Sequence, residues 1–414
     1  MPCELRIFGG ASFRKWLAAT VAKSPSGQYR SAWPTKREVE VEHPGGASGA
    51  HSSPLDRSWS ARQESGDSVS VGSPKSVLRW TLGLALLGLL LALAWWSGGG
   101  TGGSAKATLI DPKHRKLFEA WQLNPDRAFG YLESICALGT RVSGSPGMER
   151  QQKLLADFFR KAGAEVSFQE FPARHPQTGQ PVAMKNLIAR WNPSAKRRWL
   201  LAAHYDTRPF PDRDPKQPQG VFLGANDGAS GVALMQELSH AMKKLPDSLG
   251  LDMVLFDGEE LIFDEARDRE LYFLGSTHFA QQIAAGAHHR YEAGVLVDMI
   301  ADKYLEIFYE TNSYRFAPEL VREIWKVADR LDIRAFVPRT RYEIRDDHLP
   351  LNQIAKIPVV DLIDFDYPRP SSRQAGYWHT TQDTPDKCSG ESICLVGGVL
   401  LEWLKDRVAA TTNR

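Results

Sequence analysis

Cysteine is scarce in this sequence. Only four of 414 residues are cysteines, at positions 3, 136, 388 and 394. They are too few and too scattered for a disulfide framework or for a thiolate zinc site with paired spacing. Cys388 and Cys394 alone are near enough in sequence for a local bridge, and two buried or free thiols are an equal alternative.

The sequence also lacks an excess of charge of either sign. It has 51 lysines and arginines against 49 aspartates and glutamates, a formal net charge of +2, and no basic block is interleaved with aromatic residues. Surfaces that bind nucleic acid need such blocks, so we expect no nucleic-acid partner. Hydrophobic residues make up 42% of the chain, enough to fill a core, and the length suits one large domain with appendages.

The first part of the chain has no sustained hydrophobic period. Residues 1–76 are rich in Ser, Gly, Pro and charged residues, so we expect a disordered leader. Residues 77–96 form one apolar run in which Arg79 is the only charge and tryptophans lie near both ends, a pattern typical of a short transmembrane helix. A signal peptide is the alternative, but the run is long for one and no clear cleavage site follows.

Basic residues mark one side of this apolar run. Lys75 and Arg79 lie at its beginning, whereas the next charge after it is Lys106. The positive-inside rule then predicts a single-pass membrane protein with a cytoplasmic leader and an exported domain, in the periplasm or a lumen. Residues 97–114 begin glycine-rich and are expected to form a flexible linker, and residues 115–414 form the large domain.

The large domain alternates between helical and strand patterns. Apolar residues recur at helical spacing over residues 147–162, and short apolar runs follow. The lengths of these runs and the helical spacers between them predict buried strands of an α/β sheet. The runs are WLLAA at 199–203, MVLF at 253–256, GVLV at 294–297, LEIFY at 305–309 and IPVVDLI at 357–363.

Polar residues follow the ends of several predicted strands. They are His204 and Asp206, then Asp257, Glu259 and Glu260, then Asp298, and after the last strand Trp378 and His379. Ligands of an open α/β sheet bind outside the carboxyl ends of its strands, so these residues can converge. Asp227 lies in the turn GANDGAS, where its glycine neighbours allow a close approach to a cation.

Each of these residues has an ordinary explanation when taken singly. A histidine such as His204 is more often structural than a ligand, Asp227 could cap a helix, and Glu259 with Glu260 could be a solvated acidic pair. Together, two histidines and three carboxylates at strand ends form a mixed nitrogen and oxygen set suited to zinc. The adjacent glutamates add a division of labour, since one can bind metal while its neighbour transfers protons.

Seven short motifs then occur in an order known from one superfamily. They are HYD, ANDGASG, FDGEE, LGSTHFA, VDM, DDHLP and WHT, and they span most of residues 130–405. In these motifs the chain resembles the zinc exopeptidase superfamily, which implies a three-layer α/β fold with a central mixed, largely parallel sheet flanked by helices. Two branches share this scaffold: co-catalytic zinc aminopeptidases, and glutaminyl-peptide cyclotransferases, which close an N-terminal Gln into pyroglutamate and release ammonia.

Three features resemble the cyclotransferases more than the aminopeptidases. Asp346 precedes the Asp-His pair of DDHLP, and Trp378 directly precedes the histidine of WHT. A long segment, LIFDEARDRELYF, separates the glutamate pair from LGS and resembles an insertion in the cyclases. A single membrane anchor with an exported domain also resembles the Golgi-resident cyclases.

Other features depart from that branch. The tryptophan that cyclases carry after the glutamate pair is missing from residues 261–270, and Ala203 replaces a disulfide cysteine of animal cyclases. His204, Asp206 and Asp298 would also satisfy a two-zinc aminopeptidase site. We therefore predict a cyclotransferase, with a zinc aminopeptidase as the alternative. An inactive exopeptidase domain used as a binding module is disfavoured, because Glu259 and every ligand position are filled.

The resemblance also implies roles for individual residues. One zinc ion would be held by Asp227, Glu260 and His379, with His204 and Asp298 as ligands if a second zinc binds. Zinc would polarise the γ-amide carbonyl of an N-terminal Gln, and the α-amine of the peptide itself would attack that carbon. The substrates implied are the N-termini of peptides or proteins.

Three further residues complete the implied site. Glu259 would carry the proton from the α-amine to the leaving ammonia. Asp298 and Asp346 would crowd Glu259, so that the carboxyl groups share protons and one pKa is raised. Trp378 would form an apolar wall of the substrate pocket, and ordinary core packing is its alternative reading.

Overall fold

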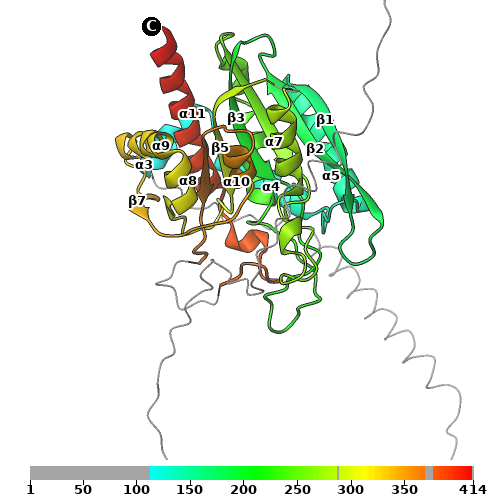
Figure 1. Ribbon diagram of the computed structural model, residues 1–414. Helices are drawn as coiled ribbons and strands as arrows, with labels where there is room; N and C mark the ends of the chain where they lie inside the picture. The colour runs from blue at the N-terminus through cyan, green and yellow to red at the C-terminus, as the bar shows by residue number, and fades with distance from the viewer. Residues whose placement is uncertain (1–111, 287–288, 369–375, 413–414) are drawn as a thin grey trace, which may run out of the picture. The chain divides into compact units, whose positions relative to one another are not determined.

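The computed structural model describes residues 112–286, 289–368 and 376–412 (Figure 1). The predicted leader, the predicted transmembrane helix at 77–96 and nearly all of the predicted linker lie outside the described residues. The first described helix begins at Pro112, slightly before the expected start of the domain. Across the described part of the chain, no helix combines the length and the apolar character needed to cross a membrane.

The main sheet has six strands, and a smaller sheet has two. The main strands are β1 (Glu165–Arg174), β2 (Pro181–Trp191), β3 (Arg197–His204), β4 (Leu249–Phe256), β5 (Tyr291–Asp298) and β8 (Val359–Ile363). The smaller sheet pairs β6 (Ile307–Tyr309) with β7 (Phe336–Thr340).

The α-helices precede, separate or follow these strands in the chain. They are α3 (Pro112–Trp121), α4 (Pro125–Cys136), α5 (Pro146–Ala162), α6 (Ala229–Leu238), α7 (Leu274–Ala284), α8 (Thr311–Phe316), α9 (Pro318–Arg330), α10 (His348–Gln353) and α11 (Gly390–Thr412). Short 3-10 turns occur at Met242–Lys244, Arg269–Leu271 and Pro385–Lys387.

The main sheet is mixed, and most of its strand pairs are parallel. The strand order is β1-β2-β4-β3-β5-β8. β2 pairs antiparallel with both β1 and β4, whereas the pairs β4 with β3, β3 with β5 and β5 with β8 are parallel. The carboxyl ends of β3, β4, β5 and β8 therefore meet at the same edge of the sheet.

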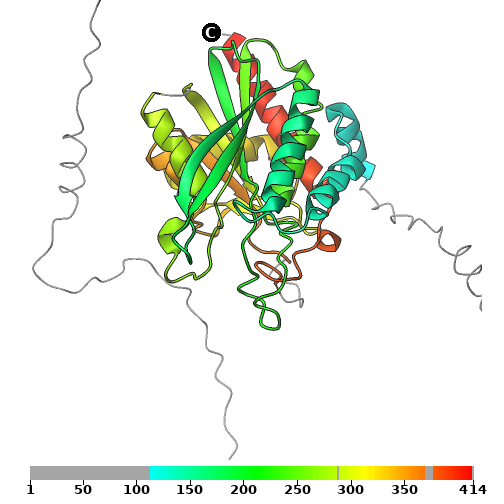
Figure 2. The same ribbon diagram turned by 90° about the vertical axis from the view of Figure 1, so that its right-hand side faces the viewer.

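Helices cover both faces of this sheet, which gives the expected three layers (Figures 1 and 2). On β3, Leu201 and Ala203 pack into a core with α4, α5, α6 and α11, whereas Leu200 and Ala202 pack on the other face against α7 and α10. Side chains alternate between faces along a strand, so a run of apolar residues is what a strand buried on both faces requires. The predicted fold class is confirmed.

Helix α5 shows how the local sequence sets its ends. Ser145 caps the helix by accepting a hydrogen bond from the Met148 backbone N–H, and Pro146 occupies the first turn. Gly163 ends the helix in the left-handed region, with φ of 102°. The prediction of a helix over 147–162 is therefore confirmed to within a residue.

One strand prediction needs correction, and two strands of the main sheet were missed. Of the segment 305–309, only Ile307–Tyr309 forms a strand, and it pairs with β7 outside the main sheet. Strands β1 and β2 were not predicted, because β1 is largely exposed and the apolar run of β2 is interrupted by Lys185 and Asn186.

The cysteines at 136, 388 and 394 are buried and free, so the local bridge between Cys388 and Cys394 is absent from the described structure.

Candidate active site

The parallel strands bring the predicted residues to one edge of the sheet. His204 is the last residue of β3, and Asp298 is the last residue of β5. The segment Asp257–Glu260 directly follows β4. His204 Nε2 lies 3.2 Å from Asp298 Oδ1, so two strand ends that are far apart in sequence are in direct contact.

Asp227 lies in a tight loop before α6, between two histidines. Its Oδ1 is 3.2 Å from His204 Nε2, and its Oδ2 is 3.5 Å from His379 Nε2. Gly228 has φ of 94°, and a Cβ there would lie 2.9 Å from the carbonyl oxygen of Asp206. The loop can therefore approach the strand ends this closely only with glycine at that position.

His379 joins this cluster from the segment after β8. Its Nε2 lies 3.2 Å from Glu260 Oε1. The five predicted ligands thus form a continuous series of contacts, in the order Asp298, His204, Asp227, His379 and Glu260. Within this series, donor atoms of His204, Asp227 and Glu260 all lie within 4.8 Å of one another.

The donor atoms of this cluster fit zinc. They are imidazole nitrogens and carboxylate oxygens on side chains that are buried, except for the half-buried Asp298, and zinc binds such a set readily. Each histidine also has a carboxylate behind its other ring nitrogen: Asp206 Oδ1 lies 3.6 Å from His204 Nδ1, and Asp212 Oδ1 lies 3.3 Å from His379 Nδ1. Such outer carboxylates orient a histidine so that Nε2 faces the metal.

Arg208 was not among the predicted site residues, although its buried guanidinium touches two of the predicted ligands. Its Nη1 donates to Glu260 Oε1 at 2.8 Å and lies 3.1 Å from His379 Nε2. Burial alone would raise the pKa of Glu260, but Arg208 and His379 lower it to about 2. The arginine stands two residues after HYD in the sequence, and that position at a strand end was the available signal.

Asp206 faces His204 and also fixes the backbone of Glu259 and Glu260. Its Oδ1 accepts from the Glu259 backbone N–H at 3.2 Å, and its Oδ2 accepts from that of Glu260 at 3.0 Å. Both glutamates therefore have a fixed backbone position at the end of β4, which is what a rigid site requires.

Several other carboxyl groups act on the pKa of Glu259. Burial raises its pKa well above the usual value, and the charges of Glu260, Asp346 and Asp347 raise it further. Asp346 is also buried, and its pKa is raised by burial and by the charges of Asp298 and Asp347. The Oδ1 atom of Asp346 accepts from the Asp347 N–H at 2.5 Å, whereas Oδ2 has no hydrogen-bond partner within the described chain.

Trp378 lies beside the metal-ligand cluster. Its ring centroid is 3.9 Å from that of His379 and 4.9 Å from that of Phe365, and the Arg213 guanidinium lies over the indole at 4.3 Å. The indole is half-buried, so part of its surface remains available to a substrate. Its predicted role as a pocket wall stays a prediction.

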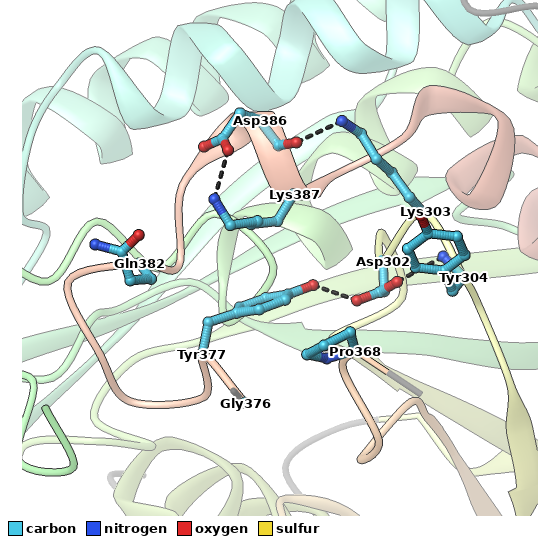
Figure 3. Close-up of a pocket in the computed structure, with 9 residues that line it drawn as sticks. All are labelled: Asp302, Lys303, Tyr304, Pro368, Gly376, Tyr377, Gln382, Asp386 and Lys387. Carbon is cyan, nitrogen blue, oxygen red and sulfur yellow. Dashed lines mark hydrogen bonds and ion pairs between the residues drawn. The ribbon is translucent and has the colours of Figure 1, made fainter. Parts of the chain in front are cut away.

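A cavity of about 550 Å³ lies on the neighbouring segment, and it contains none of the predicted ligands (Figure 3). Tyr377, which precedes Trp378, lines it and donates a hydrogen bond to Asp302. The other lining residues are Asp302, Lys303, Tyr304, Pro368, Gly376, Gln382, Asp386 and Lys387. The cavity therefore borders the site without being part of it.

Comparison with known proteins places the chain in a family. Residues 186–404 match the model of peptidase family M28, which is more than half of the chain. The chain belongs to peptidase family M28.

Its relatives include cyclases and a zinc exopeptidase. The bovine glutaminyl-peptide cyclotransferase is 29% identical over 305 residues, covering 64% of this chain and 78% of that one. The crystal structure of Fimbriiglobus ruber glutaminyl cyclase is 42% identical, with a TM-score of 0.63, and covers 68% of this chain and 95% of that one. A Zn-dependent exopeptidase from Parabacteroides distasonis is 29% identical, with a TM-score of 0.62, and covers 68% and 98%.

Proposed function

We propose that residues 115–414 form a zinc-dependent glutaminyl-peptide cyclotransferase, which converts the N-terminal Gln of peptides or proteins to pyroglutamate and releases ammonia. The similarity to two cyclases, one of them at 42% identity over nearly its whole length, supports this activity. The zinc-compatible cluster at the strand ends supports the cofactor.

The observation that carries the proposal is the third carboxyl group near Glu259. Asp346 is buried, its charge raises the pKa of Glu259, and one of its oxygens has no hydrogen-bond partner among the described residues. Buried carboxyl groups that repel one another share protons. Such sharing is useful when a proton must move between two nitrogens of one substrate, whereas activation of water by a metal pair has less need of it.

In this mechanism the residues of the chain position the substrate and move one proton. The α-amine nitrogen attacks the γ-amide carbon, a new C–N bond closes the ring, and the bond to the amide nitrogen breaks. Glu259 takes the proton from the α-amine and delivers it to the leaving nitrogen, which departs as ammonia. Trp378 covers the apolar part of the ring and keeps water away from the reacting carbon.

We propose one zinc ion, held by Asp227, Glu260 and His379. When bound, it supplies Lewis acidity to the γ-amide carbonyl. Asp227 contacts both His204 and His379. Its carboxylate can therefore face a zinc ion held with Glu260 and His379 or one held with His204 and Asp298. Arg208 fixes the Glu260 carboxylate through its guanidinium and its backbone N–H, which donates to Oε2 at 3.2 Å.

An aminopeptidase is the second candidate, because a second ligand set is present. His204 Nε2 lies 3.2 Å from both Asp227 Oδ1 and Asp298 Oδ1, which suits another zinc ion. Two zinc ions per chain, together with hydrolysis of Leu-peptides, would favour this candidate.

We further propose that residues 77–96 anchor the enzyme in a membrane, with residues 1–76 in the cytoplasm and the catalytic domain in the periplasm or a lumen. The apolar run with tryptophans near both ends and the basic residues at its beginning support this arrangement. The substrates would then be exported peptides or proteins.

Asp346→Asn tests the proposed reaction. We expect the variant to keep its fold and its zinc, because Asp346 contacts none of the proposed ligands of this ion, while ammonia release from Gln-peptides falls strongly. Asp329→Asn, on the exposed face of α9, is the matched control and should behave as wild type. Full ammonia release by Asp346→Asn would remove the main geometric support for the cyclotransferase.

A further inference from the structure

Arg141 is a buried arginine that the proposed mechanism does not use. It lies between α4 and α5, its side chain is fully buried, and it forms no ion pair with a carboxylate among the described residues. A buried guanidinium is costly unless its donors are satisfied. Its two terminal nitrogens donate to three backbone carbonyl oxygens, those of Gly139, Leu223 and Gly224, whereas Nε has no hydrogen-bond partner in the described chain.

Two of these carbonyls belong to the loop that carries Asp227. Nη1 donates to Leu223 O at 2.5 Å, and Nη2 donates to Gly224 O at 3.1 Å. Gly224 has φ of 53°, so the chain turns sharply where the guanidinium holds it. Arg141 therefore fixes the beginning of the loop 223–227.

Asp383 holds the other end of the same loop. Its Oδ1 accepts from the Asn226 N–H at 2.8 Å, and its Oδ2 accepts from the Asp227 N–H at 3.1 Å. Its backbone oxygen also accepts from the Ala225 N–H at 3.4 Å. This carboxylate is fully buried and comes from the segment after His379.

We propose that Arg141 and Asp383 form a clamp that sets the affinity of the proposed zinc site by fixing Asp227. A guanidinium holds the carbonyls at one end of the loop, and a carboxyl group holds the amides at the other. The loop contains Gly224 and is followed by Gly228. Without the clamp it therefore has more conformations, and ordering them on zinc binding costs free energy. The inference rests on the proposed zinc ligands and holds for either reaction of the site.

Zinc affinity of the purified full chain, measured by competition with a chelator at fixed pH, tests the clamp. Outer residues of metal sites typically change metal affinity by about 10- to 100-fold. We expect a loss of this size for Arg141→Lys, which cannot reach both loop carbonyls, and for the isosteric Asp383→Asn, which puts an N–H₂ group against a backbone N–H. The double variant should lose less than the product of the two losses, because both residues hold the same loop.

Arg198→Lys is the matched control. Arg198 is equally buried and donates to the backbone oxygens of Trp191 and Asn192, but it also pairs with Asp252. It lies at the opposite end of β3 from His204, about 20 Å away along an extended strand. We expect this variant to lower the melting temperature and leave the dissociation constant for zinc unchanged.

Melting temperatures measured in parallel separate positioning from simple destabilisation. The clamp is supported if Arg141→Lys and Asp383→Asn weaken zinc binding while Arg198→Lys, with a comparable fall in melting temperature, does not. Wild-type zinc affinity in both clamp variants would overturn it. Asp227→Ala is the reference variant. If it keeps zinc, the ligand assignment and the clamp fail together. If the wild-type chain binds zinc but forms no pyroglutamate, only the proposed reaction is contradicted.

Discussion

Glu259 and Glu260 are neighbours in sequence, yet their carboxyl groups have opposite electrostatic surroundings. Arg208 and His379 lower the pKa of Glu260 to about 2 against the effect of burial, whereas burial and the charge of Glu260 raise the pKa of Glu259. An ionised carboxylate suits a metal ion, and a carboxyl group that takes up a proton suits proton transfer. The structure thus supports a division of labour that the pair only suggested in the sequence.

Substitution of the two glutamates should separate zinc binding from catalysis. Glu259→Gln is expected to keep zinc and lose at least about 100-fold in rate, the usual scale for removal of a general acid or base. Glu260→Ala should lose both zinc and activity, and so should Asp227→Ala and His379→Ala, because the site needs all three ligands. Zinc per chain and the rate of ammonia release are the measurements.

The surface glutamate Glu270 provides the control for these substitutions. It is exposed, so Glu270→Gln should match wild type in zinc content and rate. Stoichiometric zinc retained in all three ligand variants would contradict the assigned site.

Sequence patterns identified the candidate ligands but missed the residues that hold them. His204 and Asp298 were found because they end apolar runs, and parallel strands bring such ends together. Arg208 shared this signal, because it closely follows the end of β3, but Arg141 and Asp383 have no such marker, since their contacts come from chain segments that meet only in the fold. Buried charges that bond to backbone atoms leave no periodic pattern in the sequence.

At the scale of elements, helix α6 packs unusually close to the sheet. A Cβ added at Gly231 would lie 2.6 Å from the Cβ of Ala203 in β3 and 3.0 Å from the carbonyl oxygen of Val297 in β5. This close packing brings the Asp227 loop, just before α6, against the ends of both strands. Gly231 thus connects the position of a helix with the geometry of the site.

Gly231→Ala should therefore destabilise the protein. The added methyl meets a strand on each side, so we expect an overpacking cost near 3 kcal/mol, reduced by roughly 1 kcal/mol because alanine is the better helix former. Gly130 in α4 has no atom within 4 Å of an added Cβ, and Gly130→Ala is the control. It should stabilise the protein by about 0.5–1 kcal/mol.

The free energy of unfolding from denaturant titration measures both changes. If Gly231→Ala stabilised the protein as much as Gly130→Ala, α6 could move away from the sheet at little cost, which would contradict this prediction.

The strands of the main sheet differ in burial, and the buried ones are the ones that the sequence predicts. The parallel strands β3, β4, β5 and β8 are buried on both faces, so they read as short apolar runs and were predicted. The edge strand β1 is mostly exposed and lacks such a run. Segment 305–309 is apolar because it packs under α9, so its composition could not tell which sheet it joins.

At the scale of the whole molecule, the proposed membrane arrangement rests on Lys75, Arg79 and the uncharged segment after the apolar run. A reporter enzyme fused after Arg414 should be active outside the cytoplasm, and the same reporter fused before residue 77 should be active inside it. Cytoplasmic activity of the C-terminal fusion would contradict the proposed orientation.

The most direct test of the cyclotransferase is to identify the products made by the purified full chain with zinc. Peptides with N-terminal Gln and matched peptides with N-terminal Leu are incubated separately, and pyroglutamyl peptide, ammonia and free amino acid are quantified. We expect equal amounts of pyroglutamyl peptide and ammonia from the Gln-peptides, with little free leucine from the Leu-peptides. Robust leucine release without pyroglutamate formation would contradict it and identify an aminopeptidase.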